Sequence, residues 1–144
     1  MNEKQTIVLG SLGLIPFYIN TFLIIFFPKI YHLNSDILHQ VLIIYASLII
    51  SFLSGMHWER IINYKKNRLY ILPMLPVIFA WSNQFVHLEF YNELIVIFLL
   101  IWCLIMDLIL LKENTNIWYK KLRVYLTLLA IVSFFPQFFY QYNQ

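Results

Sequence analysis

Two side chains of opposite charge stand in apolar parts of the sequence, where a lone charge is unfavourable. Asp107 lies inside an apolar run, and Arg123 follows the polar connection after that run. In a helical hairpin with its tip near Thr115, positions 107 and 123 are equidistant from the tip and should face each other. A charge at the centre of a membrane helix costs roughly 2.5–3.5 kcal/mol on insertion scales, so a partner is expected. The spacing predicts an Asp107–Arg123 ion pair, with Thr127 one turn deeper on the same face as Arg123.

This predicted pair has two interpretations. The structural one, which the sequence favours, is an ion pair that fixes the register of the hairpin. The functional one is a polar relay, or a site at which Arg123 binds an anionic head group. With a histidine at a matching level, the candidate polar cluster is His57, Asp107, Arg123 and Thr127.

His57 belongs to the stretch SFLSGMHWER, which ends an apolar segment. Histidine changes charge near neutral pH, so together with a carboxylate it can shuttle a proton. The favoured interpretation is nevertheless interfacial, with Trp58 at the lipid head groups and Glu59 and Arg60 in water. The sequence leaves open whether His57 turns toward Asp107 or lies against the head groups.

Potential metal ligands also occur in two other polar connections. In one connection, the spacing of His32, Asp36 and His39 would place all three on one helical face. Neither connection contains a compact H-x₃-H or HExxH motif. Solvated loop ends are the ordinary explanation, so we predict no metal site. The sequence also lacks a nucleophile elbow, a phosphate-binding glycine loop and a CxxC motif, so no catalytic residue and no cofactor are predicted. The residues considered are His32, Asp36, His39, His87, Glu89 and Glu93.

Small residues recur every four positions in the segment that leads to His57. Ser47, Ser51 and Gly55 form this stripe, in a chain with only three glycines. In lipid, a small-xxx-small stripe lets two helices approach closely, because packing drives their association. We interpret the stripe as an internal packing face. A dimer seam or a ligand groove is the alternative.

The elements that position these residues are indicated by composition. The 144 residues are 61% apolar and 12% charged, whereas a soluble domain is about half apolar and a quarter charged. Five apolar stretches each approach the roughly 20 residues that span a bilayer, and backbone in lipid favours helices. The sequence predicts an all-α integral membrane protein with one domain, residues 1–144, and five transmembrane helices in an up-down bundle. The approximate spans are residues 7–27, 38–58, 69–86, 94–111 and 122–139, with kinks at Pro16 and Pro136.

Basic residues predict the orientation of these helices. Lysines and arginines in short loops stay on the cytoplasmic side. With five spans, nine of the ten basic residues fall on the side of the N-terminus, and Lys29 is the exception. The prediction is therefore N-terminus inside and C-terminus outside, in a bacterial inner membrane. Trp58, Trp118 and Tyr119 fall at the inner interface, where they are expected to act as anchors.

Three stretches in order resemble a known family. LGLIPF opens the first span, SFLSGMHW closes the second, and WYKKLRVYLT follows Asp107. This pattern resembles the small membrane proteins of domain of unknown function 3429, which include mitochondrial transmembrane protein 69, over nearly the whole chain. Family members typically carry a second glycine where this chain has Ser54. The resemblance brings no established activity. It implies motif positions at Pro16, Ser51, Gly55, Trp58, Asp107, Trp118, Arg123 and Thr127.

These observations support three hypotheses about function. The leading one is a non-catalytic membrane subunit, or an assembly or scaffold factor, whose partners are the lipid bilayer and other membrane helices or further copies of itself. The second is a transporter or channel component. The third is a lipid- or quinone-active enzyme that uses His57, Asp107 and Arg123. The net charge of +3 is too small to suggest nucleic acid as a partner.

Overall fold

The structure is a computed structural model that describes residues 3–63, 71–85, 89–110 and 117–142. All regular elements in these ranges are helical. They are α1 (Glu3–Leu12), α2 (Ile15–Phe26), α3 (Pro28–Leu33), α4 (Ser35–Asn63), α5 (Met74–Ser82), the 3₁₀ helix η2 (Asn83–Phe85), α6 (Glu89–Leu110), α7 (Ile117–Val132) and α8 (Phe135–Tyr142).

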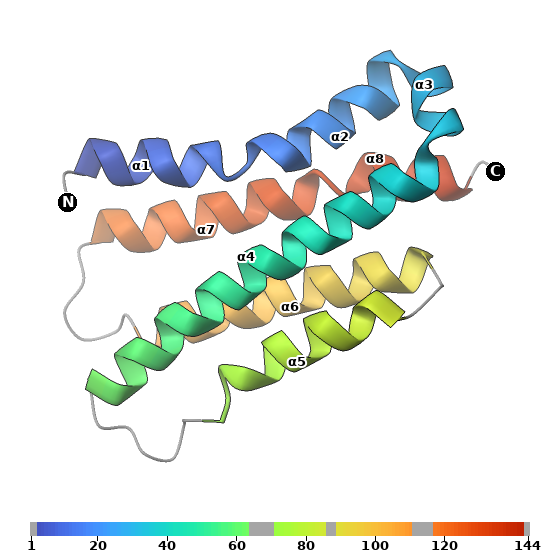
Figure 1. The fold of residues 1–144 in the computed structure, drawn as a ribbon. Helices are drawn as coiled ribbons and strands as arrows, with labels where there is room; N and C mark the ends of the chain where they lie inside the picture. The colour runs from blue at the N-terminus through green and yellow to red at the C-terminus, as the bar shows by residue number, and fades with distance from the viewer. Residues whose placement is uncertain (1–2, 64–70, 86–88, 111–116, 143–144) are drawn as a thin grey trace.

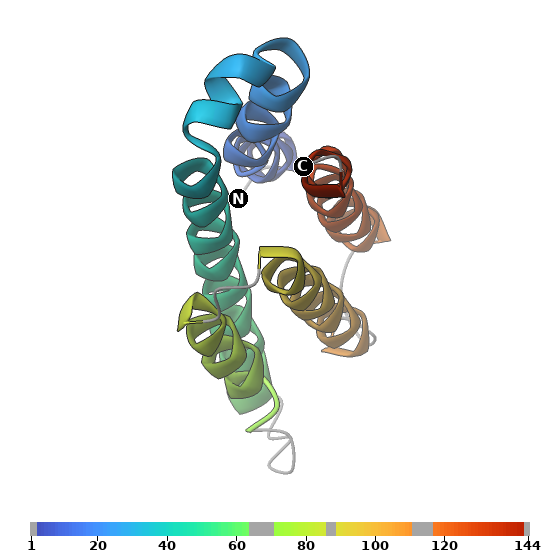
Figure 2. The ribbon, with the colours of Figure 1, turned by 90° about the vertical axis from the view of Figure 1, so that its right-hand side faces the viewer.

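The helices form a bundle in which the chain runs back and forth between two ends (Figure 1). The N-terminus lies at one end and the C-terminus at the other, and α3 turns the chain between α2 and α4. α4 packs against α5 and α6, and α6 packs against α7. α1 and α2 lie along α7 and α8, as the view in Figure 2 also shows.

Three helical segments are long and apolar enough to cross a membrane. They are Ser35–Asn63, Tyr91–Leu110 and Ile117–Phe139, and the α1–α2 pair gives a fourth candidate if its bent halves form one span. α5 has nine residues, or about 14 Å of helix, against about 30 Å of bilayer core. The predicted all-helical membrane architecture is confirmed. Of the five predicted spans, three or four are long and apolar enough to cross a membrane within the described residues.

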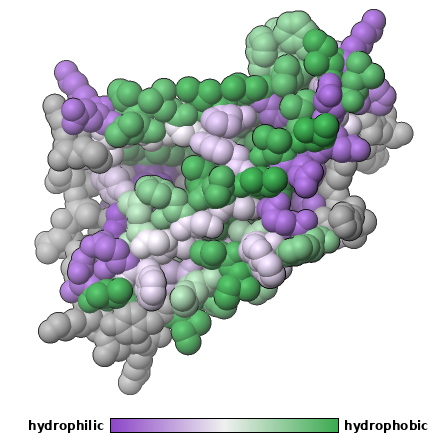
Figure 3. All heavy atoms as spheres, viewed as in Figure 1, coloured by the Kyte–Doolittle hydropathy of each residue, from purple (hydrophilic) through white to green (hydrophobic). Residues whose placement is uncertain are grey.

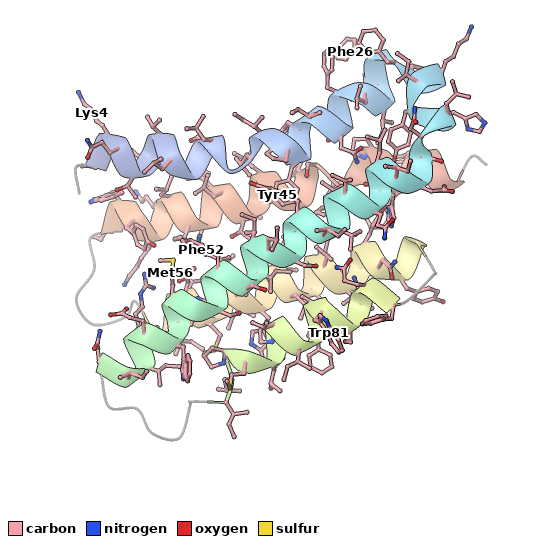
Figure 4. The ribbon with its side chains drawn as sticks, viewed as in Figure 1. Lys4, Phe26, Tyr45, Phe52, Met56 and Trp81 are labelled. Atoms are coloured by element: carbon pink, nitrogen blue, oxygen red, sulfur yellow. The ribbon has the colours of Figure 1, made fainter. Side chains whose placement is uncertain are left out.

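Proline accounts for the breaks in the first and last segments, as the sequence predicts. Pro16 lies in the first turn of α2, where a missing N–H is tolerated, and α1 and α2 meet at 41°. The Tyr45 hydroxyl of α4 donates a hydrogen bond of 2.9 Å to the carbonyl of Gly13 at this bend (Figure 4). Pro136 similarly lies in the first turn of α8, just after the break that follows α7.

The core is apolar, and so is much of the outer surface. Ile50 of α4, Leu99 of α6 and Phe134 next to α8 are all buried in one hydrophobic cluster. Figure 3 shows apolar residues across much of the visible face, with hydrophilic residues gathered toward its two ends. Outward-facing side chains such as Phe26 and Trp81 (Figure 4) are more than 60% exposed. An apolar exterior of this kind fits a bilayer as the surrounding solvent.

Candidate functional site

Asp107 is the centre of a buried polar cluster at the end of the bundle where the N-terminus lies. Arg60 Nη1 donates a hydrogen bond of 3.0 Å to Asp107 Oδ1, and Arg123 Nε donates one of 2.5 Å to Oδ2. His57 Nε2 lies 3.1 Å from Oδ1, within ion-pair distance but off the direction of a hydrogen bond. We call His57, Arg60, Asp107 and Arg123 the Asp107 cluster.

Three helices supply the Asp107 cluster. His57 and Arg60 are three residues apart on α4 and therefore share a face. Asp107 comes from α6 and Arg123 from α7, the two arms of the predicted hairpin. The cluster thus joins the hairpin to the longest helix of the bundle.

The four side chains of the Asp107 cluster differ in burial, and positive charges outnumber negative charges. The side chains of His57 and Asp107 are 1% exposed, whereas those of Arg60 and Arg123 are 17% and 11% exposed. The two guanidinium groups carry two positive charges against one carboxylate. The cluster therefore has a net charge of +1 with a neutral histidine.

Tyr119 extends the Asp107 cluster toward the end of α7. Its ring centroid is 5.8 Å from the Arg60 guanidinium carbon, a cation–π distance. Arg60 Nη2 also donates a hydrogen bond of 3.4 Å to the Tyr119 hydroxyl. Trp118 packs edge-on against Tyr119 with the ring centroids 5.8 Å apart. Trp118 and Tyr119, which the sequence predicts as interfacial anchors, therefore also help to position Arg60.

The structure brings together three of the four residues of the predicted polar cluster. Asp107 and Arg123 pair across the hairpin, and His57 turns toward them rather than toward the head groups. Thr127 is buried one turn beyond Arg123, in the wall of a cavity that both residues share. The expectation that Arg60 lies in water is wrong, because Asp107 draws it into the bundle. The sequence did contain one indication of this inward position, since Arg60 lies one helical turn after His57 and therefore on the same face of the helix.

The small-residue stripe of α4 faces α5. Gln84 Nε2 donates a hydrogen bond of 2.9 Å to the Ser47 hydroxyl, which lies 3.5 Å from the carbonyl oxygen of Ala80. The Ser51 hydroxyl bonds back to the carbonyl of Ser47. At the other end of the stripe, a Cβ atom built on Gly55 meets no heavy atom within 4 Å. The stripe thus packs closely at Ser47 and is open at Gly55.

A second buried polar cluster occupies the opposite end of the bundle. His39 Nδ1 lies 3.3 Å from Glu93 Oε1 and 2.7 Å from Gln137 Nε2. Asn20 Nδ2 donates a hydrogen bond of 3.2 Å to Gln137 Oε1. We call Asn20, His39, Glu93 and Gln137 the His39 cluster. His39 Nδ1 can accept a hydrogen bond from Gln137 Nε2 or donate one to Glu93 Oε1, but not both at once, because this nitrogen is either unprotonated or protonated.

The His39 cluster corrects the expectation of solvated loop ends. His39 and Glu93 are 5% and 0% exposed, whereas His32 and Asp36 are exposed as expected. His87 and the side chain of Glu89 lie outside the described residues. No three potential ligands in the described ranges gather as a metal site would require.

The two clusters lie on one face of α4. His39 and His57 are 18 residues apart, which is five helical turns and about 27 Å. This separation approaches the thickness of a bilayer core. The interior between the clusters is filled by the apolar core.

Long apolar helices, an apolar exterior and charges buried in clusters together define a polytopic α-helical membrane protein. A family model described as "Protein of unknown function (DUF3429)" matches residues 2–139, so the chain belongs to this family. The resemblance to domain of unknown function 3429, seen in three stretches of the sequence, is therefore confirmed. Searches among curated proteins and among solved structures gave no match.

Proposed function

We propose that this protein is a non-catalytic membrane subunit, or an assembly or scaffold factor, that receives a transmembrane helix of another membrane protein. The observation that carries the proposal is the groove between α4 and α5, where Gly55 faces open space. Ser51 and Ser54 lie on the same wall of this groove. Small residues at a lipid-facing position allow the close backbone approach that drives helix association in lipid.

The groove has the dimensions of a packing site. Its volume is about 260 Å³, and its opposite wall is the first turn of α5 with Val77 and Ile78. Trp58, which is 43% exposed, closes the end nearest the head groups. Tryptophan is a residue that commonly dominates binding energy where partners meet. The groove therefore offers an aromatic anchor beside a flat, small-residue surface.

The alternatives find less support in the described residues. A transporter needs a polar path between the Asp107 and His39 clusters, but Ile50, Leu99 and Phe134 fill that interior. An enzyme that uses His57 and Asp107 needs room for a ligand that reaches both side chains. Both side chains are only 1% exposed.

We also propose five crossings of a bacterial inner membrane, with the N-terminus inside and the C-terminus outside. The segment of residues 71–85, which contains α5 and η2, would form the remaining crossing. The positive-inside rule supports this orientation, since nine of the ten basic residues fall on the side of the N-terminus. The opposite placement of the two termini in the bundle agrees with an odd number of crossings (Figure 1).

The substitution Gly55→Phe tests the proposed docking. The open space at Gly55 accommodates the ring in the isolated protein, so the fold should persist while the groove is filled. We expect native mass spectrometry in mild detergent to show a partner polypeptide on the wild-type protein and at least a tenfold loss of it in Gly55→Phe. Ile105→Phe, on the exposed face of α6, is the matched control and should retain the partner.

Two outcomes would contradict the proposal. One is a wild-type protein that is a bare monomer under conditions that retain membrane complexes. The other is equal loss of the partner in Gly55→Phe and Ile105→Phe, which would place the contact elsewhere. If the bound polypeptide is a second copy of this chain, the protein is a homo-oligomer, and the proposal of a different partner protein is wrong.

A further inference from the structure

A narrow cavity of about 170 Å³ lies where α7 meets α4 and the α1–α2 segment. Among the described residues its wall is apolar, apart from Arg123 and Thr127 of α7. Phe52 of α4 also lines it, between α4 and α7 in Figure 4, and is 66% exposed. The cavity therefore extends from the lipid-facing surface to the edge of the apolar core.

The residues that line the cavity extend over about two turns of the helices on each side. Its lining extends from Arg123 to Ala130 on α7 and from Leu9 to Phe17 on the α1–α2 segment. At 1.5 Å per residue these lengths are about 10 and 12 Å. Arg123 lies at one end, and the other end reaches Phe17 and Ala130 of the apolar core. A lining that is charged at one end and apolar over about the next 10–12 Å suits the part of an acyl chain that lies next to a polar head group.

Arg123, at the polar end of the cavity, belongs to the Asp107 cluster, in which positive charge exceeds negative charge. Asp107 provides one negative charge, whereas Arg60 and Arg123 provide two positive charges. Lys120 lies one turn before Arg123 on the same face of α7 and is half-buried. Arg123 Nη2 lies 2.5 Å from Asp107 Oδ2, so this one carboxylate offsets only one of the two guanidinium charges and a charge of +1 is left before Lys120 is counted. An anion with several oxygen atoms would balance this excess positive charge.

We propose that this cavity holds an acyl chain of an anionic phospholipid, whose phosphate is bound by Arg123 and Lys120. A guanidinium group matches the geometry of phosphate oxygens, and an ammonium group adds a point charge beside it. Basic pockets between transmembrane helices recognise anionic head groups in the same way. A zwitterionic lipid fits less well, because its own ammonium group offsets the attraction.

Lipid exchange on the full-length protein tests this site. The detergent-solubilised protein is exchanged into nanodiscs of either phosphatidylglycerol or phosphatidylcholine. The protein is then released from the nanodiscs, and native mass spectrometry counts the lipid molecules that stay bound to it. We expect at least tenfold greater retention of phosphatidylglycerol. Lys120→Gln should lower this retention about fivefold, since one basic residue near the membrane surface contributes a change of that size. Lys121→Gln, at an exposed neighbouring position of α7, is the matched control and should leave retention unchanged.

A second variant tests the acyl-chain half of the proposal. Ala130→Leu extends a side chain into the apolar end of the cavity and leaves Arg123 and Lys120 in place. It should lower the retention of long-chain phosphatidylglycerol, measured at a temperature at which circular dichroism shows that the variant is folded. Unchanged retention in this variant would overturn the acyl-chain assignment.

Three further outcomes would overturn the site as a whole. They are equal retention of the two lipids, equal losses in Lys120→Gln and Lys121→Gln, and displacement of bound phosphatidylglycerol by millimolar inorganic phosphate. The last result would identify free phosphate, and not a lipid, as the ligand.

Discussion

Replacement of Asp107 by asparagine isolates the electrostatic role of the Asp107 cluster. Asparagine has nearly the size of aspartate, so the substitution leaves no cavity. It removes the charge and replaces one carboxylate oxygen by an NH₂ group, which cannot accept a hydrogen bond from arginine. Arg60 and Arg123, which both pair with Asp107, then lie close together without a carboxylate. We expect Asp107→Asn to destabilise the bundle more than any other single charge removal in this cluster.

The expected magnitude follows from burial. Removal of one partner from a buried ion pair costs about 3–5 kcal/mol. The lower end applies because Arg60 and Arg123 are 17% and 11% exposed and can extend toward the interface. We expect a loss of about 3 kcal/mol, or roughly a 150-fold lower ratio of folded to unfolded protein. Arg60→Gln should cost only about 1.5–2 kcal/mol, because Asp107 keeps its hydrogen bond to Arg123.

Unfolding in mixed micelles of a mild detergent and dodecyl sulfate, followed by far-ultraviolet circular dichroism, measures these differences. Glu59→Gln is the control, because it removes one carboxylate from an exposed position of α4 and should stay within about 0.5 kcal/mol of wild type. The reasoning is refuted if Asp107→Asn is no less stable than Glu59→Gln. It is also refuted if Asp107→Asn and Arg123→Gln are additive, since paired residues must couple.

Two further predictions concern the opposite end of the bundle and the topology. Gln137→Leu should lower the stability by about 1–3 kcal/mol in the same assay, because Asn20 and His39 lose a buried hydrogen-bond partner; Gln40→Leu, at an exposed position, should not. In intact cells, a membrane-impermeant maleimide should label Lys29→Cys but not Lys121→Cys, whereas buried Cys103 stays unlabelled in both; the reverse pattern would invert the proposed orientation.

The Asp107–Arg123 contact could be predicted because it is local. The two helices are connected by a short polar segment, so equal distances from its tip imply equal depth. The high cost of an unpaired charge in lipid then selects the partner. Neither argument requires knowledge of the rest of the bundle.

Arg60 and the His39 cluster could not be predicted in this way. A long basic side chain at a helix end can reach water or turn inward, and the choice depends on Asp107, 47 residues away. Asn20, His39, Glu93 and Gln137 come from four different segments. Each one alone resembles a polar residue near a helix end. Their burial follows only from the packing of α2, α4, α6 and α8 around one point.

The helix that least matches its predicted span is α5. Hydropathy indicates an apolar stretch over residues 69–86, but the described helix begins at Met74, after Pro73 at its N-cap. Proline is tolerated there because the first turn does not need its N–H. Hydropathy measures composition and does not locate this start.

The sequence by itself determined the membrane class, the apolar segments, their breaks at proline and the hairpin ion pair. These depend on composition and on contacts between neighbouring segments, which hydropathy and helical spacing describe. The tertiary structure decided which polar side chains turn inward, where α4 is left open at Gly55, and that Arg123 borders an apolar cavity. Those features arise where helices distant in the sequence meet, and the free energy of burying a polar group depends on the partners that it finds there.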